Sequence, residues 1–244
     1  MSRIQRREAS SVFRQGPFEI RRIRPGRIRS EGADPALGPL AAIDHADLGV
    51  GTIVSMHEHR NDEILSYLRR GLMVHQDSAG HRVSLSPERI MMMNAGRSFW
   101  HEETAPDSPV EMLQIFIRPS EADLDGRVNF LDLETVEKTQ GWRLIAGPED
   151  SGAPLQIRNS VVVQDTFLPR GNSLPSPFQA GMVLWLYVMD GEAVISGQTL
   201  TKGDAITDLD GPLGDILAAA DATLIAFLVD PKAPASTAGT ISGH

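Results

Sequence analysis

The residues best suited to chemistry lie in two short segments, and each segment places two metal-binding side chains two positions apart. The first carries His57 and His59, and the second carries His101 and Glu103. Side chains two positions apart in a β-strand point to the same face, so each pair would present its groups together. Imidazole and carboxylate groups bind first-row divalent metals. We therefore expect two strands that face one interior and share one ion.

Short runs with strand character, separated by turn signals, must position these groups. Asp190-Gly191 is a strong hairpin signal between the runs at 184–189 and 192–195. Many short strands at this spacing predict an antiparallel sandwich or barrel. The runs include 12–13, 18–20, 40–43, 52–59, 64–68, 72–76, 81–85, 90–93, 98–103 and 111–117, and later 142–146, 155–159, 161–168, 181–189, 192–196, 204–207 and 223–229.

The pattern predicts two β-domains of similar size. We assign residues 1–130 to the first domain and 131–231 to the second. The second domain could be a duplicate of the first, but the identity between the halves is too low to establish a repeat. Residues 232–244 are small, polar and contain proline, and are expected to form a flexible tail.

Composition narrows the functional classes. The 244 residues include no cysteine, which excludes disulfides, thiolate zinc sites and cysteine nucleophiles. No apolar run approaches the roughly 20 residues of a membrane span, and no signal peptide is evident, so we expect a cytoplasmic protein without membrane contact. Residues 1–30 hold nine arginines within a chain of net charge −9. This basic segment could contact an acidic partner, but pairing with the acidic body is the simpler interpretation, and direct nucleic-acid binding is not expected.

The order and spacing of several motifs resemble the pirin family of the cupin superfamily. The resemblance is dense over residues 36–118 and looser afterwards. The motifs are His57-Glu58-His59-Arg60, Glu63 with Tyr67, His75 with Asp77-Ser78 and Gly80, Ala95-Gly96 with His101 and Glu103, and Met112-Leu113-Gln114.

The resemblance implies an all-β bicupin, with two tandem cupin barrels of the double-stranded β-helix or jelly-roll type. It implies one mononuclear divalent metal in the N-terminal barrel, held by His57, His59, His101 and Glu103. Fe(II) is the expected metal, with Mn, Ni, Co, Cu and Zn as alternatives. In many other cupins the ligand is the glutamate of the first motif, so Glu63 is the competing fourth ligand or a base. The C-terminal barrel is expected to be metal-free.

The resemblance also implies an activity like that of quercetin 2,3-dioxygenase, with a small aromatic substrate and O2. Glu103 or Glu63 would take the proton of a flavonol hydroxyl group. By strand parity Phe99 would face inward, where it could narrow the pocket or stack on an aromatic substrate. Gln114 could bind a ligand near the metal or pair with backbone. The alternative is a non-catalytic iron-binding regulator of a transcription factor or metabolic enzyme. We expect a monomer.

Overall fold

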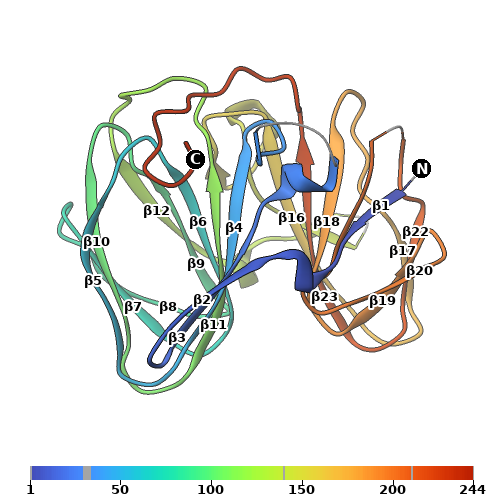
Figure 1. The fold of residues 1–244 in the computed structure, drawn as a ribbon, viewed down its shortest axis with the longest axis horizontal. Coiled ribbons are helices and arrows are strands. Elements are labelled where there is room, and N and C mark those ends of the chain that lie inside the picture. The colour runs from blue at the N-terminus through green and yellow to red at the C-terminus, as the bar shows by residue number, and fades with distance from the viewer. Residues whose placement is uncertain (1, 30–33, 140, 210, 244) are drawn as a thin grey trace.

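Two β-barrels lie side by side in the computed structural model, which describes residues 2–29, 34–139, 141–209 and 211–243 (Figure 1). The chain is an all-β protein with two tandem barrels. Its helical elements are four short 3-10 segments in the described residues, and none of these is long and apolar enough to cross a membrane. They are η1 (Arg7–Ala9), η2 (Pro25–Arg29), η3 (Leu133–Thr135) and η4 (Glu149–Ser151).

The first barrel consists of a large sheet and a small sheet. The large sheet has the order β12 (Arg127–Asp132), β9 (Arg89–Asn94), β6 (Glu63–Arg70), β11 (Val110–Ile117), β4 (Leu40–Leu48), β3 (Phe18–Ile23) and β2 (Ser11–Gln15). The small sheet has the order β5 (Thr52–His59), β10 (Phe99–Ala105), β7 (Met73–Asp77) and β8 (Arg82–Leu85).

The second barrel repeats this arrangement. Its large sheet has the order β1 (Ser2–Gln5), β21 (Ala205–Asp208), β18 (Val183–Asp190), β23 (Ala222–Val229), β16 (Val161–Leu168), β14 (Trp142–Gly147) and β13 (Lys138–Thr139), and β15 (Leu155–Gln156) pairs with β14. Its small sheet has the order β17 (Ser173–Pro175), β22 (Asp215–Ala218), β19 (Glu192–Ile195) and β20 (Gln198–Thr201). The matching order shows a structural duplication that sequence identity alone did not establish.

The central strands of the large sheets are apolar on both faces because each sheet is covered on both sides. In β11, Met112 and Phe116 point into the first barrel, whereas Leu113 and Ile115 point toward the second. The latter join a shared core with residues of the second barrel, including Trp185 and others from β16, β18 and β23. This face-to-face contact of the two large sheets holds the barrels together (Figure 1).

The hairpin predicted at Asp190-Gly191 is wrong, because the strands on either side of it enter different sheets. Asp190 pairs with Thr223 in the large sheet, whereas Glu192 pairs with Thr201 in the small one. Gly191 has φ +83°, and a Cβ there would lie 1.9 Å from the carbonyl oxygen of Asp221. The Asp-Gly sequence correctly indicates a turn, but it does not determine which strands pair on either side of that turn.

The two ends of the chain cross between the barrels. Strand β1 pairs with β21 of the second barrel, so the predicted assignment of residues 1–130 to one barrel does not describe this strand. The predicted division after residue 130 falls inside β12, which still pairs with β9 through Asp132. Residues 232–243 are not the expected loose tail, since they return to the first barrel and bond to it, for example from Ser236 N to the Pro119 carbonyl at 2.8 Å. Figure 1 shows the C-terminus over the first barrel and the N-terminus beside the second.

Candidate metal centre

Strands β5 and β10 lie side by side and turn three imidazoles into the first barrel. His57 and His101 are direct cross-strand partners, with ring centroids 4.4 Å apart. The His59 ring centroid lies 4.9 Å from that of His57 and 5.1 Å from that of His101. One nitrogen from each ring lies within 4.8 Å of the other two. The sequence prediction that these histidines converge is therefore met by their geometry.

Hydrogen bonds fix which ring nitrogens of His57 and His59 face the centre. His57 Nδ1 donates to the Ser55 carbonyl at 2.9 Å, and His59 Nδ1 donates to Asp62 Oδ2 at 2.8 Å. A neutral imidazole carries one proton, so each Nε2 presents a lone pair. The two Nε2 atoms are 3.1 Å apart. Two lone pairs at that distance repel each other, and a cation between them would remove the repulsion.

His101 is buried, and neither of its ring nitrogens has a hydrogen-bond partner among the described residues. Burial, followed by the neighbouring His57, His59 and His75, lowers the His101 pKa to about 2. Burial also lowers the pKa of His57. Both rings are therefore neutral at physiological pH and can donate lone pairs to a metal.

Glu103 lies at the edge of this group. Its Oε1 is 3.9 Å from His101 Nδ1, and its carboxylate forms a second close group with His101 and His75 instead of joining all three imidazoles of the first. Gln114 Nε2 donates to both carboxylate oxygens, at 2.9 and 2.7 Å. Burial raises the pKa of Glu103 to about 7, against the opposing effect of the Gln114 hydrogen bond. Gln114 thus contacts a proposed metal-binding carboxylate, and its predicted contact with a bound ligand stays a prediction.

These donors fit a first-row divalent ion. Three imidazoles and a nearby carboxylate match the ligand types that such metals accept. The unpartnered nitrogens of buried His101 are a strong sign, since buried polar atoms are rarely left without a partner. His57, His59, His101 and Glu103 are the residues that would hold the ion.

A cavity of about 160 Å³ opens beside the centre, and His57, His59, Glu103 and Gln114 lie on its wall. Apolar side chains form much of the remainder, including Phe18, Ile20, Leu48, Val54, Met112 and Phe116. A second hollow, of about 320 Å³, adjoins it and shares Phe18, Ile20 and Arg22. The centre therefore faces a mostly apolar space that continues along the β2–β3 hairpin.

Two predicted site residues lie elsewhere. Glu63 Oε1 accepts from Arg158 Nε at 2.8 Å, and its Oε2 accepts from Asn94 Nδ2 at 2.6 Å and from the Arg158 backbone amide at 2.8 Å. These contacts occupy the carboxylate of Glu63, so it does not join the histidines. Phe99 faces inward as parity requires, but it packs in the apolar core and does not line the cavity. Aromatic wall contacts come from Phe18 and Phe116 instead.

His75 lies beside the centre, in one close group with His101 and Glu103, although it was not among the predicted metal ligands. It is buried in β7 opposite Glu103, with its ring centroid 5.4 Å from that of His101. Its Nε2 donates to Asp77 Oδ2 at 2.9 Å, which leaves an unpartnered lone pair on Nδ1. The sequence could have indicated this position, because His75 and Asp77 lie two positions apart in one strand and therefore both point to its inner face.

The arginine-rich N-terminal segment pairs in part with the acidic body, as the simpler interpretation proposed. Arg6 contacts Asp204 of the second barrel at 2.8 Å, and Arg22 forms two bonds with Asp44 beside the cavity, at 2.8 and 2.6 Å.

Two consecutive jelly-roll barrels, with three imidazoles and a carboxylate gathered in the first, define a bicupin. Comparison with family models agrees with both halves. Residues 33–117 match the model described as Pirin, and residues 144–228 match the model described as Quercetinase C-terminal cupin domain. The two matches together span well over half of the chain, which belongs to the pirin family.

Known proteins similar to this chain carry related names. A quercetin 2,3-dioxygenase of Escherichia coli K12 is 26% identical over 188 residues, which cover 76% of this chain and 78% of that protein. A pirin-like protein of Solanum lycopersicum is 27% identical over 199 residues, which cover 78% of this chain and 67% of that protein.

Solved structures show the same fold. YhhW from E. coli superposes with a TM-score of 0.80 at 21% identity, covering 94% of this chain and 97% of that one. The nickel(II) complex of YhhW gives a TM-score of 0.79 at 20% identity, covering 94% and 99% of the two chains. A quercetin 2,3-dioxygenase from Acinetobacter baumannii gives 0.73 at 21% identity, covering 95% and 86%.

Proposed function

We propose that this protein is a metal-dependent dioxygenase that opens the heterocycle of a flavonol such as quercetin. The observation that carries the proposal is the grouping of His57, His59, Glu103 and Gln114 on one wall of a mostly apolar cavity. The names of the relatives, quercetin 2,3-dioxygenase among them, favour this substrate class. Fe(II) is the metal we expect, in a cytoplasmic monomer.

A divalent ion bound by these residues supplies Lewis-acid and redox chemistry for the reaction of an electron-rich substrate with O2. The imidazoles of His57, His59 and His101 would hold the ion. Glu103 is the carboxylate on the cavity wall, and we assign to it the proton of the flavonol 3-hydroxyl group. Gln114, which donates to Glu103, orients that carboxylate. Both oxygen atoms of O2 enter the ring-opened ester, the ring carbon that carried the 3-hydroxyl group leaves as carbon monoxide, and Glu103 returns its proton to the carboxylate of the product.

The apolar walls position the rest of the substrate. The cavity of about 160 Å³ beside the centre is smaller than the roughly 300–1,000 Å³ of typical ligand pockets. A flavonol would therefore place its reacting ring there and extend its second ring along the adjoining hollow, where Phe13 and Phe18 lie. Aromatic faces at this place can stack on the substrate and exclude water from the reacting ring.

An oxygen electrode tests the proposal. The purified protein is loaded in turn with Fe, Mn, Ni, Co and Cu and mixed with quercetin, and the His101→Ala variant serves as the comparison. We expect oxygen consumption by wild type with one or more of the metals and none by the variant. No consumption with any metal and any flavonol would overturn the dioxygenase proposal.

The alternative function is a non-catalytic iron-binding regulator of a transcription factor or metabolic enzyme. Strand β2 favours it, since β2 ends the large sheet of the first barrel and all its residues are exposed, including Phe13 at 55%. An unpaired strand edge can bind an extended segment of a protein partner. Pull-downs with the reduced and oxidised iron forms test it, and the absence of a partner in both states would count against it.

A further inference from the structure

The C-terminal segment, residues 236–243, is bonded to the first barrel next to the candidate metal centre. The backbone amide of Thr240 donates to the Arg60 carbonyl at 2.9 Å. Arg118 Nε donates to the Ser242 carbonyl at 2.7 Å, and Ser242 is fully buried. The segment follows the last strand of the second barrel, so the second half of the chain reaches back to the site in the first.

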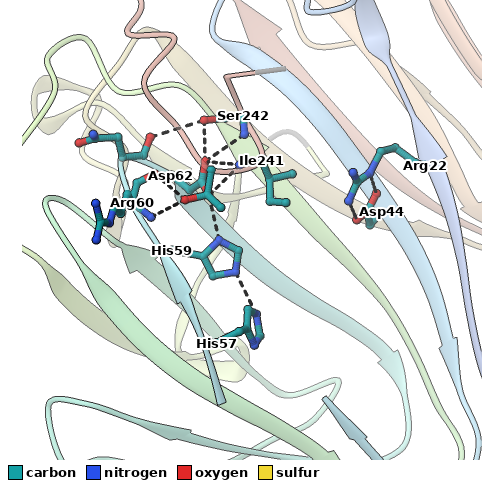
Figure 2. A network of polar contacts seen from close by, with 10 residues as sticks. Arg22, Asp44, His57, His59, Arg60, Asp62, Ile241 and Ser242 are labelled. Atoms are coloured by element: carbon teal, nitrogen blue, oxygen red, sulfur yellow. Dashed lines mark hydrogen bonds and ion pairs between the residues drawn. The ribbon is translucent and has the colours of Figure 1, made fainter. Parts of the chain in front are cut away.

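Figure 2 shows the carboxylate of Asp62 at the centre of these contacts. The Asp62 side chain is fully buried. Ser242 donates to Asp62 Oδ1 twice, from its backbone amide at 2.9 Å and from its hydroxyl at 2.7 Å. The Ile241 amide lies 3.2 Å from both carboxylate oxygens. The fourth donor is His59 Nδ1, at 2.8 Å from Oδ2. Three of the four donors thus belong to the C-terminal segment.

This arrangement links the C-terminal segment to a metal-binding side chain. Asp62 holds the Nδ1 proton of His59, which fixes the ring and aims Nε2 at His57 and His101. Groups that orient ligand histidines in this way commonly change metal affinity about 10- to 100-fold when they are removed. The side chain of Ile241 also lines the cavity beside the centre.

We propose that the C-terminal segment is a positioning element of the metal centre, in which Ser242 and the Ile241 amide hold Asp62 so that Asp62 holds His59, while the Ile241 side chain forms one wall of the ligand cavity. The proposal rests on the metal site of the proposed function, and it does not depend on whether the bound metal catalyses flavonol cleavage.

Gly239 offers a sharp way to displace the segment. A Cβ at this position would lie 2.0 Å from Ser242 Oγ and 2.5 Å from Asp62 Oδ1, so Gly239→Ala forces the segment away from the carboxylate. A Cβ at Gly211 would meet no atom within 4 Å among the described residues, so Gly211→Ala makes the same chemical change without a clash. Ser242→Ala is the milder variant, and Ser236→Ala, whose hydroxyl accepts from the Ala238 amide, is its control in the same segment.

The first measurement is the dissociation constant of Co(II) for the full-length chain, by equilibrium dialysis, together with the Co(II) absorption spectrum. We expect Gly239→Ala to weaken binding about 10- to 100-fold and to change the spectrum, and Ser242→Ala to weaken it roughly threefold to tenfold. Gly211→Ala and Ser236→Ala should stay within about twofold of wild type. Co(II) binding by Gly239→Ala and Ser242→Ala that equals wild type would overturn the proposal, as would a wild type that binds no metal.

A second measurement separates the two roles of the segment. Ile241→Ala keeps the backbone amide that contacts Asp62, so it should leave Co(II) affinity unchanged. The loss of its side chain from the cavity wall should weaken flavonol binding severalfold, as measured by fluorescence quenching. Ser242→Ala should weaken Co(II) binding and leave flavonol affinity unchanged. If both variants lower both affinities equally while the melting temperature falls, the segment only stabilises the fold, and the positioning proposal is wrong. Failure of oxygen consumption alone would overturn the dioxygenase activity and leave these binding results in force.

Discussion

The two small sheets have the same strand order, but the side chains that they turn into their barrels differ in polarity. In the first barrel, the small sheet turns His57, His101 and His75 inward. In the second, the corresponding strands place Ile216 and Ile195 in an apolar core. The central strand, β10 in one and β22 in the other, is where the contrast is greatest. One fold thus accommodates either a polar centre or a continuous hydrophobic core.

This difference teaches that the polar centre is not needed for the fold. The second barrel closes without a histidine between residues 131 and 231. Among the described residues, His75 and His101 of the first barrel keep three buried ring nitrogens without hydrogen-bond partners. A buried polar group left unpaired costs about 1–3 kcal/mol, so the first barrel carries a stability cost for a site that it does not require structurally. Function rather than folding explains these residues.

Making the first interior resemble the second should have the largest effect. His101→Leu removes a proposed ligand, so we expect metal affinity to fall by about 100-fold or more, because even groups that only orient ligands contribute about 10- to 100-fold. The metal-free variant should be more stable than metal-free wild type by roughly 1 kcal/mol, since two unpartnered nitrogens disappear. Elemental analysis and thermal unfolding measure the two effects.

The control for this change is a variant that keeps the polar cluster but alters another buried histidine. His45→Gln serves here, because His45 contacts Tyr187 and Glu111 between the barrels and not the cluster. It should retain wild-type metal content. An unchanged metal content in His101→Leu would contradict the assignment of the centre to the first barrel.

Cutting a cavity into the second interior should have the opposite pattern. Ile216 is fully buried on β22, and Ile216→Ala should destabilise the fold by about 2–5 kcal/mol. Metal content should not change, because the closely grouped His and acidic side chains of the described residues that could hold an ion lie in the first barrel. Urea unfolding and elemental analysis test both statements, and a parallel loss of metal would mean that the barrels do not differ in role.

The sequence predicted what strand parity and local spacing determine. The two i, i+2 pairs placed His57, His59 and His101 in one interior because the period of a strand is two. The same reasoning correctly predicted that the Phe99 side chain faces the barrel interior, but it could not predict how far along the barrel axis the side chain lies. Parity gives the face of a side chain, whereas position along the barrel axis decides whether it reaches the cavity or the core.

Two of the failures involve partners distant in the chain. Glu63 has ligand-like spacing, yet its carboxylate is taken by Arg158, 95 residues away. The C-terminal segment is small and polar, and its order depends on Asp62, 180 residues away from Ser242. Neither contact leaves a periodic pattern in the sequence. The corner at Asp190-Gly191 misled for the related reason that turn chemistry is local and strand pairing is not.

The contact of Glu111 with Lys202, which joins the two barrels, should make the stability of the protein depend on pH in the acid range. Burial alone would raise the pKa of Glu111, but hydrogen bonds from His45 and Lys202 outweigh it and hold the pKa at about 2, against an ordinary 4.5. Because the folded pKa is the lower one, this stabilisation is present above pH 4.5 and is lost as the pH falls toward 2. The full shift corresponds to about 3 kcal/mol, and screening by solvent reduces this, so we expect Glu111→Gln to remove about 1–2 kcal/mol.

Acid unfolding followed by circular dichroism measures this effect. Wild type should lose stability between pH 4.5 and 2, and Glu111→Gln should lose less over that interval while being less stable at pH 7. Glu8→Gln, at an exposed glutamate, is the control and should match wild type. Parallel pH profiles for wild type and Glu111→Gln would show that this contact does not link the barrels energetically.

The smallest expected effect concerns which barrel binds the aromatic substrate. Phe18 lines the cavity of the first barrel, and Phe178 lines a hollow of about 430 Å³ in the second. Removing an aromatic contact costs about 0.5–1.5 kcal/mol beyond its buried area, so Phe18→Ala should raise the KM for quercetin roughly threefold to tenfold with little change in kcat. Phe178→Ala should leave both constants unchanged. The reverse result would place the flavonol in the second barrel, away from the imidazoles, and would separate substrate binding from the metal centre that the first barrel retains.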